Sequence, residues 1–186
     1  LADMGAEVIK IERPGTGDES RGYRPSVAID DCAPASAFFV AFNRGKKSVT
    51  VDIADPAGAE IVRGLAAQCD ILVENHKAGG LAKYGLDYES ISAINPALVY
   101  CSVTGFGQTG PFAGRPAYDS IMQATAGLMS LCGDPEGEPQ RTAVAVADVT
   151  TGYCAAVSIL GAYIHRLRTG EGQHLDVAML DAAVAL

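Results

Sequence analysis

The fold class follows from one stretch of the sequence, Asp70–Gly105, which reads "DILVENHKAGGLAKYGLDYESISAINPALVYCSVTG". It opens with the apolar run "DILVEN" and closes with a second, "ALVYCSVTG", and both runs favour strands. Between them lie a glycine-interrupted helical segment that ends near Tyr84 and a second short helix around "YESISAI". Because both runs are apolar without alternation, they are typical of parallel strands that are covered on both faces.

The residues before this stretch repeat the alternation of strand and helix. A helix is predicted in "DPAGAEIVRGLAAQ", with Asp55 as its N-cap and Pro56 at its first position. Its buried stripe is expected to contain Ile61, Val62, Leu65 and Ala66. Two β-branched runs, Val8–Ile11 and Val49–Ile53, predict strands, and a polar, glycine-rich loop from Pro14 to about Ser36 separates them.

The residues after the stretch predict two further helices. The first is "AYDSIMQATAGLMSL", and the second is a helix of about twenty residues that follows "ADVTTG" and begins at Asp148. Capping is the simplest interpretation of Asp148, because aspartate is a favoured N-cap; a catalytic role stays open at this point. Together the elements predict an α/β fold, with a doubly wound, mostly parallel sheet in a three-layer, Rossmann-like arrangement.

The motif "GFGQTG", Gly105–Gly110, matches a dinucleotide-binding fingerprint in letters only. That fingerprint needs its third glycine in the first turn of a helix, whereas Pro111, Gly114 and Pro116 keep this chain irregular. It also lacks an acidic residue at a strand end about twenty positions further on. We expect instead a flexible loop that approaches a ligand or covers a site.

Composition excludes several classes of protein. The 186 residues are 48% hydrophobic and 19% charged, which fits one globular domain. The net charge of −8 argues against a nucleic-acid partner.

The longest strongly apolar run, "YCAAVSILGAYI", is about twelve residues, too short to span a bilayer. The three histidines have no metal-ligand spacing, so no metal is expected. Five cysteines without a C-x-x-C pair suggest reduced core thiols in a cytoplasmic protein: Cys32, Cys69, Cys101, Cys132 and Cys154.

Two cations, Arg13 and Lys77, follow predicted strand ends. Ligands of open parallel sheets bind outside the carboxyl ends of the strands, so these cations are candidates for binding phosphates. From these residues alone, ordinary surface charge is the slightly favoured interpretation. The apolar ends of the chain, "LADMGA" and "DAAVAL", suggest a piece of a longer protein.

Five motifs in order resemble the class III coenzyme A transferases, the family of formyl-CoA transferase and carnitine CoA-transferase. They are "LADMGAEVIKIERPGTGD", "FNRGKKSVTVDI", the stretch from "ILVENHK" to "GFGQTGP", "PAYDSIMQATAGLM" and "RLRTGEGQHLDVAMLDA". The resemblance implies that residues 1–186 are the N-terminal part of a CoA-binding large domain. It also implies that about twenty residues precede them and that roughly half of the protein follows.

The resemblance also implies the site residues. The family's nucleophile is an aspartate placed as Asp148 is, and "ADVTTG" matches its context. Tyr118 and Asp119, in "PAYD", match positions beside the nucleophile. The family's coenzyme A contacts correspond to Arg13, Val51, Asn75, His76, Lys77 and Lys83. The implied reaction moves CoA from an acyl-CoA to a free carboxylic acid through aspartyl anhydride and aspartyl-CoA thioester intermediates, in an interlocked homodimer.

For this reaction a helix N-terminus at Asp148 is expected to favour the ionised carboxylate. Backbone N–H groups near Asp148, or in the 105–110 loop, are candidates for stabilising the oxyanion.

Two alternative functions stay open. The same family contains 2-methylacyl-CoA racemases, which carry Gly-His-Asp where this chain has "AYD". An unperturbed tyrosine has a pKa near 10 and is a poor base at neutral pH, so Tyr118 favours the transferase. The second alternative is a catalytically silent domain that only binds acyl-CoA.

Overall fold

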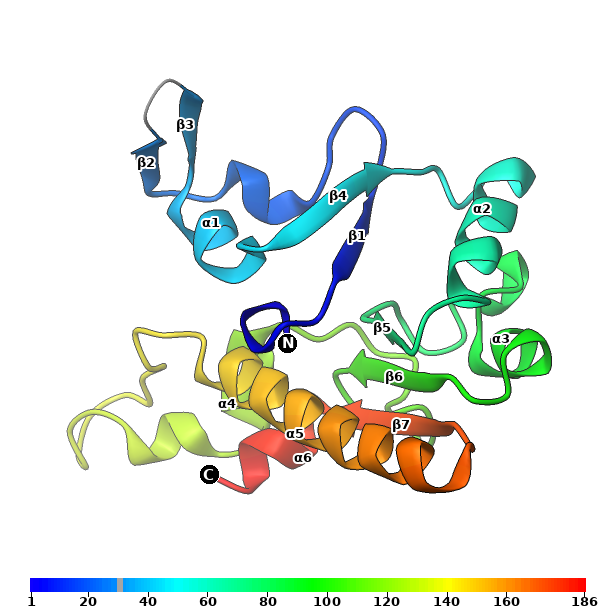
Figure 1. Cartoon of the computed structure of the whole chain (residues 1–186). Coiled ribbons are helices and arrows are strands. Elements are labelled where there is room, and N and C mark those ends of the chain that lie inside the picture. Colours follow the sequence, from blue (N-terminus) through cyan, green and yellow to red (C-terminus); the bar gives the residue numbers. More distant parts are fainter. Residues whose placement is uncertain (30–31) are drawn as a thin grey trace. The chain divides into compact units, whose positions relative to one another are not determined.

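A computed structural model describes residues 1–29 and 32–186 and divides the chain into two compact units. The N-terminal unit is Leu1–Val62 and the C-terminal unit is Arg63–Leu186. Figure 1 shows the helices and strands of both units.

The N-terminal unit contains a parallel pair of strands and an antiparallel hairpin. β1 (Val8–Glu12) pairs with β4 (Lys46–Thr50) in parallel, from Val8 opposite Lys46 to Glu12 opposite Thr50. The antiparallel pair is β2 (Ser26–Ile29) and β3 (Cys32–Ser36). The remaining elements are η1 (Ala2–Met4), η2 (Glu19–Gly22) and α1 (Ala37–Asn43).

The predicted strand at Val8–Ile11 is confirmed, whereas the second strand begins three residues earlier than its apolar run. Lys46–Ser48 are polar, yet they pair with β1 because a strand ladder needs only backbone groups. The strand ends before Asp52, whose carboxylate accepts the N–H of Ala54 at 2.9 Å and turns the chain. The predicted loop from Pro14 to Ser36 was wrong in part, since it contains η2, β2 and β3.

Helix α2 (Pro56–Ala66) begins where the sequence predicted. The Asp55 carboxylate accepts the N–H of Ala57 at 2.8 Å, so its predicted capping role is confirmed. The predicted stripe is only partly right. Ala66 is buried, but Ile61 is 54% exposed.

The C-terminal unit is a three-stranded parallel sheet with helices packed against it. The strands lie in the order β5 (Ile71–Glu74), β6 (Val99–Thr104) and β7 (Gln173–Ala178), and both pairs are parallel. The helical elements are η3 (Ala82–Tyr84), α3 (Tyr88–Ile94), α4 (Asp119–Thr125), η4 (Leu128–Leu131), α5 (Val146–Thr169) and α6 (Met179–Val184). The predicted α/β class with mostly parallel strands is confirmed.

The core of this unit lies around the central strand β6. Val99, Tyr100 and Cys101 are at most 1% exposed. Helix α3 covers one face, because the Tyr88 ring packs edge-on against Tyr100 and stacks on His174 with centroids 4.5 Å apart. The Tyr100 hydroxyl donates to the carbonyl of Leu86 at 2.7 Å, which satisfies its buried polar atom.

Glycine interrupts the helix predicted over residues 117–131. Gly127 has φ of 84°, a left-handed conformation that separates α4 from the 3-10 turn η4.

Helix α5 is the longest element and packs against β6, β7, α4 and α6. By length and composition alone it is apolar enough to cross a membrane, a property it shares with core helices of soluble proteins. The helix is twice as long as the twelve-residue apolar run within it, from which the sequence predicted no segment long enough to span a bilayer.

The described cysteines are free thiols, as expected, but not all lie in the core. Cys101 is buried, and burial raises its pKa to about 11. Cys69 and Cys132 are half-buried and Cys154 is exposed, so the core assignment of Cys154 was wrong. The side chain of Cys32 lies outside the described residues.

We predict that Gly172→Ala destabilises the C-terminal unit by about 1–3 kcal/mol. Gly172 leads into β7, and an added Cβ would lie 2.1 Å from the carbonyl oxygen of Leu98. Chemical unfolding of the full-length protein measures the loss. The matched control is Gly64→Ala in α2, where a Cβ meets nothing within 4 Å and the fold should gain up to about 1 kcal/mol. Equal stabilities of the two variants would contradict the prediction.

Candidate active site

The carboxyl edge of the β5–β6–β7 sheet gathers several of the predicted site residues. Parallel strands end at the same edge, so the segments that follow β5, β6 and β7 meet there. Helix α5 also begins at this edge, because Ala147 packs in one cluster with Met122 of α4 and with Ala183 of α6, which follows β7. Asp148 therefore lies at the edge where open α/β sheets bind ligands.

A buried carboxylate from another helix caps α5. Asp119 Oδ1 accepts the N–H of Ala147 at 2.9 Å and that of Asp148 at 3.3 Å. The helix starts at Val146, and its N-cap residue, Ala145, has no side chain to cap it. The prediction that Asp148 is the N-cap is therefore wrong. Asp148 lies within the first turn, and the cap comes from Asp119, which precedes it by 29 positions.

Asp119 is itself held by a buried amide. Asp119 is 9% exposed, and its Oδ2 accepts a hydrogen bond from Gln123 Nε2 at 2.6 Å. Gln123 is fully buried, and its Oε1 accepts the backbone N–H of Thr142 at 2.9 Å. That bond fixes which end of the amide faces Asp119. The network thus keeps the Asp119 carboxylate pointed at the start of α5.

Gln123 and Thr142 were not predicted as site residues. The spacing of Asp119 and Gln123 could have indicated Gln123, since residues four apart share a face of a helix. No local signal indicates Thr142, because its contact depends on the fold of the intervening loop.

The Asp148 carboxyl group is harder to ionise than the sequence suggested. Partial burial raises its pKa, and the negative charge of Asp119 raises it further. The expected effect of the helix N-terminus, which favours the ionised form, is therefore outweighed by burial and by the charge of Asp119. The residue remains exposed at the surface of this chain. A more basic carboxylate next to solvent suits a nucleophile.

Tyr118 precedes Asp119 and is the N-cap residue of α4, where its backbone makes the contacts. Its carbonyl accepts the N–H groups of Ile121 and Met122 at 2.9 and 3.1 Å. Its side chain is 69% exposed, and among residues 1–29 and 32–186 it has no hydrogen bond to Asp148. The structure thus brings Asp119 to the predicted nucleophile and leaves the phenol of Tyr118 at the surface.

The remaining predicted contacts of the C-terminal unit follow β5. Asn75, His76 and Lys77 are exposed at the carboxyl end of that strand. The His76 N–H donates to the carboxylate of Glu74 at 2.7 Å. Lys83 lies in η3, and its ammonium group is 4.7 Å from the centroid of the Tyr84 ring. The first three residues share the sheet edge of Asp148.

Arg13 and Val51 come together at the edge of the other sheet, in the N-terminal unit. Arg13 follows β1 and is exposed, and Val51 follows β4 and is 8% exposed. The Val51 N–H donates to the carbonyl of Glu12 at 2.9 Å, which continues the ladder one step past the strands. The two residues therefore occupy neighbouring carboxyl ends.

The glycine loop stays irregular from Gly105 to Tyr118, so the rejection of a dinucleotide fingerprint is confirmed. Its first residues are anchored. The Gly107 N–H donates to Thr104 Oγ1 at 2.9 Å, and the Gln108 N–H donates to Asp176 at 2.8 Å. These N–H groups, like those of Ala147 and Asp148, already have acceptors. To stabilise an oxyanion, as predicted, these four N–H groups would first have to give up their present acceptors.

Among residues 1–29 and 32–186, no three His, Cys, Asp or Glu side chains gather as metal ligands would.

Comparison with known proteins identifies the family. The family model for CoA-transferase family III matches residues 1–186, and the chain belongs to this family. It is 49% identical over 188 residues to the succinate–glutarate CoA-transferase of Agrobacterium fabrum, covering 100% of this chain and 47% of that protein. It is 44% identical over 185 residues to the human succinyl-CoA:glutarate CoA-transferase, covering 100% of this chain and 41% of that one.

A solved structure of similar sequence identity has the same fold. A CAIB/BAIF family protein from Brucella suis matches with a TM-score of 0.95 and 49% identity, over 100% of this chain and 49% of that chain. The chain spans about half the length of the curated relatives it matches.

We predict that Asp148→Asn raises the melting temperature of the full-length protein at pH 7. An acid whose pKa is higher in the folded than in the unfolded chain lowers stability once it ionises. The stabilising effect of asparagine should therefore disappear as the pH falls to about 4, where the unfolded aspartate also takes up its proton. Thermal unfolding across this pH range is the measurement. Glu138→Gln, at an exposed carboxylate ahead of α5, is the control and should have no such effect.

Proposed function

We propose that this chain carries the CoA-binding part and the nucleophile of a CoA-transferase, which moves CoA from an acyl-CoA to a free carboxylic acid. One observation supports this most. The Asp148 carboxylate lies at the carboxyl edge of a parallel sheet, and Asp119 has taken over the capping of its helix. Asp148 is thereby left without a structural task in the first turn of α5.

The proposed reaction begins with attack of the Asp148 carboxylate on the thioester carbonyl. The C–S bond breaks, CoA leaves as the thiolate, and an aspartyl–acyl anhydride forms. The thiolate then attacks the aspartyl carbonyl, which releases the first carboxylic acid and gives an aspartyl-CoA thioester. The acceptor carboxylate attacks the carbonyl of this thioester, the C–S bond breaks, and CoA leaves again as the thiolate while a second aspartyl anhydride forms. Return of the thiolate to the acceptor's acyl carbon releases the new acyl-CoA and free Asp148.

Asp119 supports this chemistry without reacting. Its negative charge raises the pKa of Asp148, so the attacking oxygen is more basic and a better nucleophile. Its hydrogen bonds to the backbone of Ala147 and Asp148 hold the first turn of α5 in place. Arg13, Asn75, His76, Lys77 and Lys83, with Val51, are the proposed coenzyme A contacts, and Tyr118 is the proposed neighbour of the reacting groups.

The proposed acceptors are dicarboxylic acids. Relatives at 41–46% identity are named with glutarate, oxalate or mesaconate as the acid, each of which carries two carboxyl groups, and with succinyl-CoA or acetyl-CoA as the thioester. A screen of CoA donors against free mono- and dicarboxylic acids, read by mass spectrometry, tests the class. Preference for monocarboxylic acceptors would refute it.

The racemase alternative is disfavoured by Tyr118, which replaces the histidine base of racemases that resemble this chain. We therefore expect no exchange of the α-proton of a 2-methylacyl-CoA in deuterated water. A silent acyl-CoA-binding domain would bind CoA without turnover for any donor and acceptor.

We propose a cytoplasmic, interlocked homodimer as the working form, on the strength of the family resemblance. Exposed apolar side chains such as Leu131, 82% exposed, and Val157, 70% exposed, are consistent with further covering surfaces. Sedimentation of the full-length protein should give a dimer, and a stable monomer would count against it.

We predict that Asp148 becomes acylated during turnover. Incubation of the full-length protein with an acyl-CoA and hydroxylamine should convert the activated Asp148 to a hydroxamate in the tryptic peptide Thr142–Arg166. Asp148→Asn should abolish labelling and lower transfer by several orders of magnitude, because it removes a covalent nucleophile.

Two results would refute the assignment of the nucleophile. One is near-normal transfer by Asp148→Asn, and the other is a hydroxamate on Asp119. Retained CoA binding by Asp148→Asn is the control that separates a lost nucleophile from a lost fold.

A further inference from the structure

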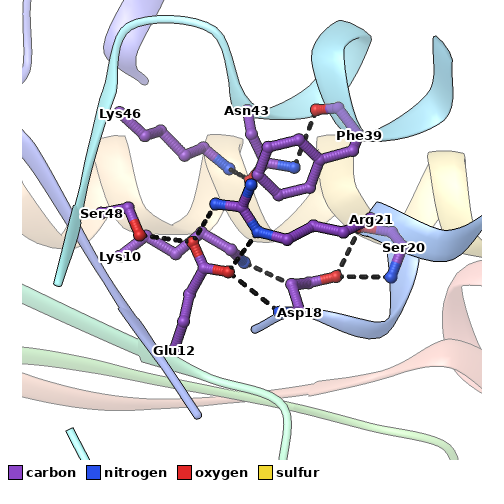
Figure 2. A network of polar contacts seen from close by, with 9 residues as sticks. All are labelled: Lys10, Glu12, Asp18, Ser20, Arg21, Phe39, Asn43, Lys46 and Ser48. Atoms are coloured by element: carbon purple, nitrogen blue, oxygen red, sulfur yellow. Dashed lines mark hydrogen bonds and ion pairs between the residues drawn. The ribbon is translucent and has the colours of Figure 1, made fainter. Parts of the chain in front are cut away.

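The carboxylate of Glu12, the last residue of β1, is buried and fully bonded. Its side chain is 1% exposed. Arg21 binds both of its oxygens, Nε to Oε2 at 2.7 Å and Nη2 to Oε1 at 2.8 Å, and the Ser48 hydroxyl of β4 donates at 2.7 Å. Figure 2 shows these groups converging on Glu12. The Arg21 pair is the main cause that lowers the pKa of Glu12 to about 2, so the carboxylate stays ionised at neutral pH.

Glu12 also closes the loop that carries Arg13. Its Oε2 accepts the backbone N–H of Asp18 at 2.9 Å, and the Gly17 N–H donates to the carbonyl of Arg13 at 2.9 Å. Gly17 has φ of 67°, and a Cβ there would lie 3.0 Å from Glu12 Oε2. The loop from Arg13 to Asp18 is therefore tied at both ends to the end of β1.

The same network pairs the cations around Arg13. Lys10 binds Asp18 at 2.6 Å, and Arg21 binds Glu12 while its guanidinium lies 3.9 Å from the centroid of the Phe39 ring. The Arg13 side chain is exposed, and it has no hydrogen bond or ion pair among residues 1–29 and 32–186. The charges of Lys10 and Arg21 are thus compensated inside the unit, and the Arg13 guanidinium at the strand end is available to an external anion.

We propose that Glu12 is a positioning residue for coenzyme A recognition, which together with Arg21 and Ser48 fixes the end of β1 so that Arg13 meets the nucleotide phosphates. This inference rests on the proposed function. The Arg21 side chain is 43% exposed, so its ion pair with the buried Glu12 adds little to stability compared with apolar packing, and its orienting effect on the loop is the more informative consequence. Glu12 contributes no contact to the ligand; it acts through the backbone of residues 13–18.

The experiment compares two thioesters of the same acid in the full-length protein. One is the acyl-CoA, and the other is the acyl-pantetheine, which lacks the nucleotide and its phosphates. We expect Glu12→Gln to raise the KM for acyl-CoA about tenfold or more, the size of a lost charge-assisted hydrogen bond, with kcat changed less than about threefold. The KM for acyl-pantetheine should stay unchanged. If Glu12 had a merely structural role, the KM values for both thioesters would change alike, and that result would overturn the inference.

Two further variants keep the test decisive. Ser48→Ala removes one hydrogen bond to Glu12, from an uncharged donor, and should raise the acyl-CoA KM in the same direction by a smaller factor than Glu12→Gln does. If Glu12→Gln does not fold, an unchanged KM in Ser48→Ala overturns the inference. Asp3→Asn breaks the exposed ion pair with Arg44 in the same unit and should leave the KM values for both thioesters unchanged.

Direct binding separates this inference from the proposed function. Calorimetry with free CoA measures affinity without turnover. A wild-type protein that binds CoA but transfers none refutes the transferase, while weaker binding by Glu12→Gln still supports the positioning role. Equal binding by wild type and Glu12→Gln overturns the positioning role whether or not transfer occurs.

Discussion

The two hydrogen bonds from the N–H groups of Ala147 and Asp148 to Asp119 are the interaction on which the candidate site depends. A helix start leaves N–H groups without partners, and an acidic side chain within the same turn ordinarily receives them. Here a buried carboxylate from α4 receives them instead. Asp148 consequently lies in the first turn of α5 with a second negative charge beside it, and its carboxylate has no hydrogen bond or ion pair in the described part of the chain.

Glu12 in the N-terminal unit and Asp119 in the C-terminal unit use a buried carboxylate in comparable ways. Glu12 accepts one backbone N–H of a later segment and Asp119 accepts two, and an exposed charged residue follows or lies beside each, Arg13 in one case and Asp148 in the other. Their electrostatic effects differ. Arg21 compensates Glu12, whereas the described partners of Asp119 are amide and backbone donors that leave its negative charge in place. The first arrangement leaves a cation free, and the second makes an adjacent acid more basic.

Parallel strand pairing explains why these groups lie at sheet edges. Strands β1 and β4 end side by side at Glu12 and Thr50, and β6 and β7 end together at Thr104 and Ala178. Every segment that follows such a strand emerges at the same edge, and a helix that leads back to the next strand begins there. The polar loops of the chain are therefore collected by backbone hydrogen bonding, without any requirement on their own sequences.

The sequence by itself determined the α/β class, the strands around Ile71 and Val99, the start of α2 at Asp55 and the candidate nucleophile, because local periodicity, capping chemistry and family motifs carry that information. Only the tertiary structure decided what caps α5 and in which direction the pKa of Asp148 moves, since both depend on Asp119, held by Gln123 and Thr142. It also decided that Lys46–Ser48 form a strand and that Glu12 is buried under Arg21. These outcomes are contacts between residues far apart in the chain, and no local pattern of side chains specifies them.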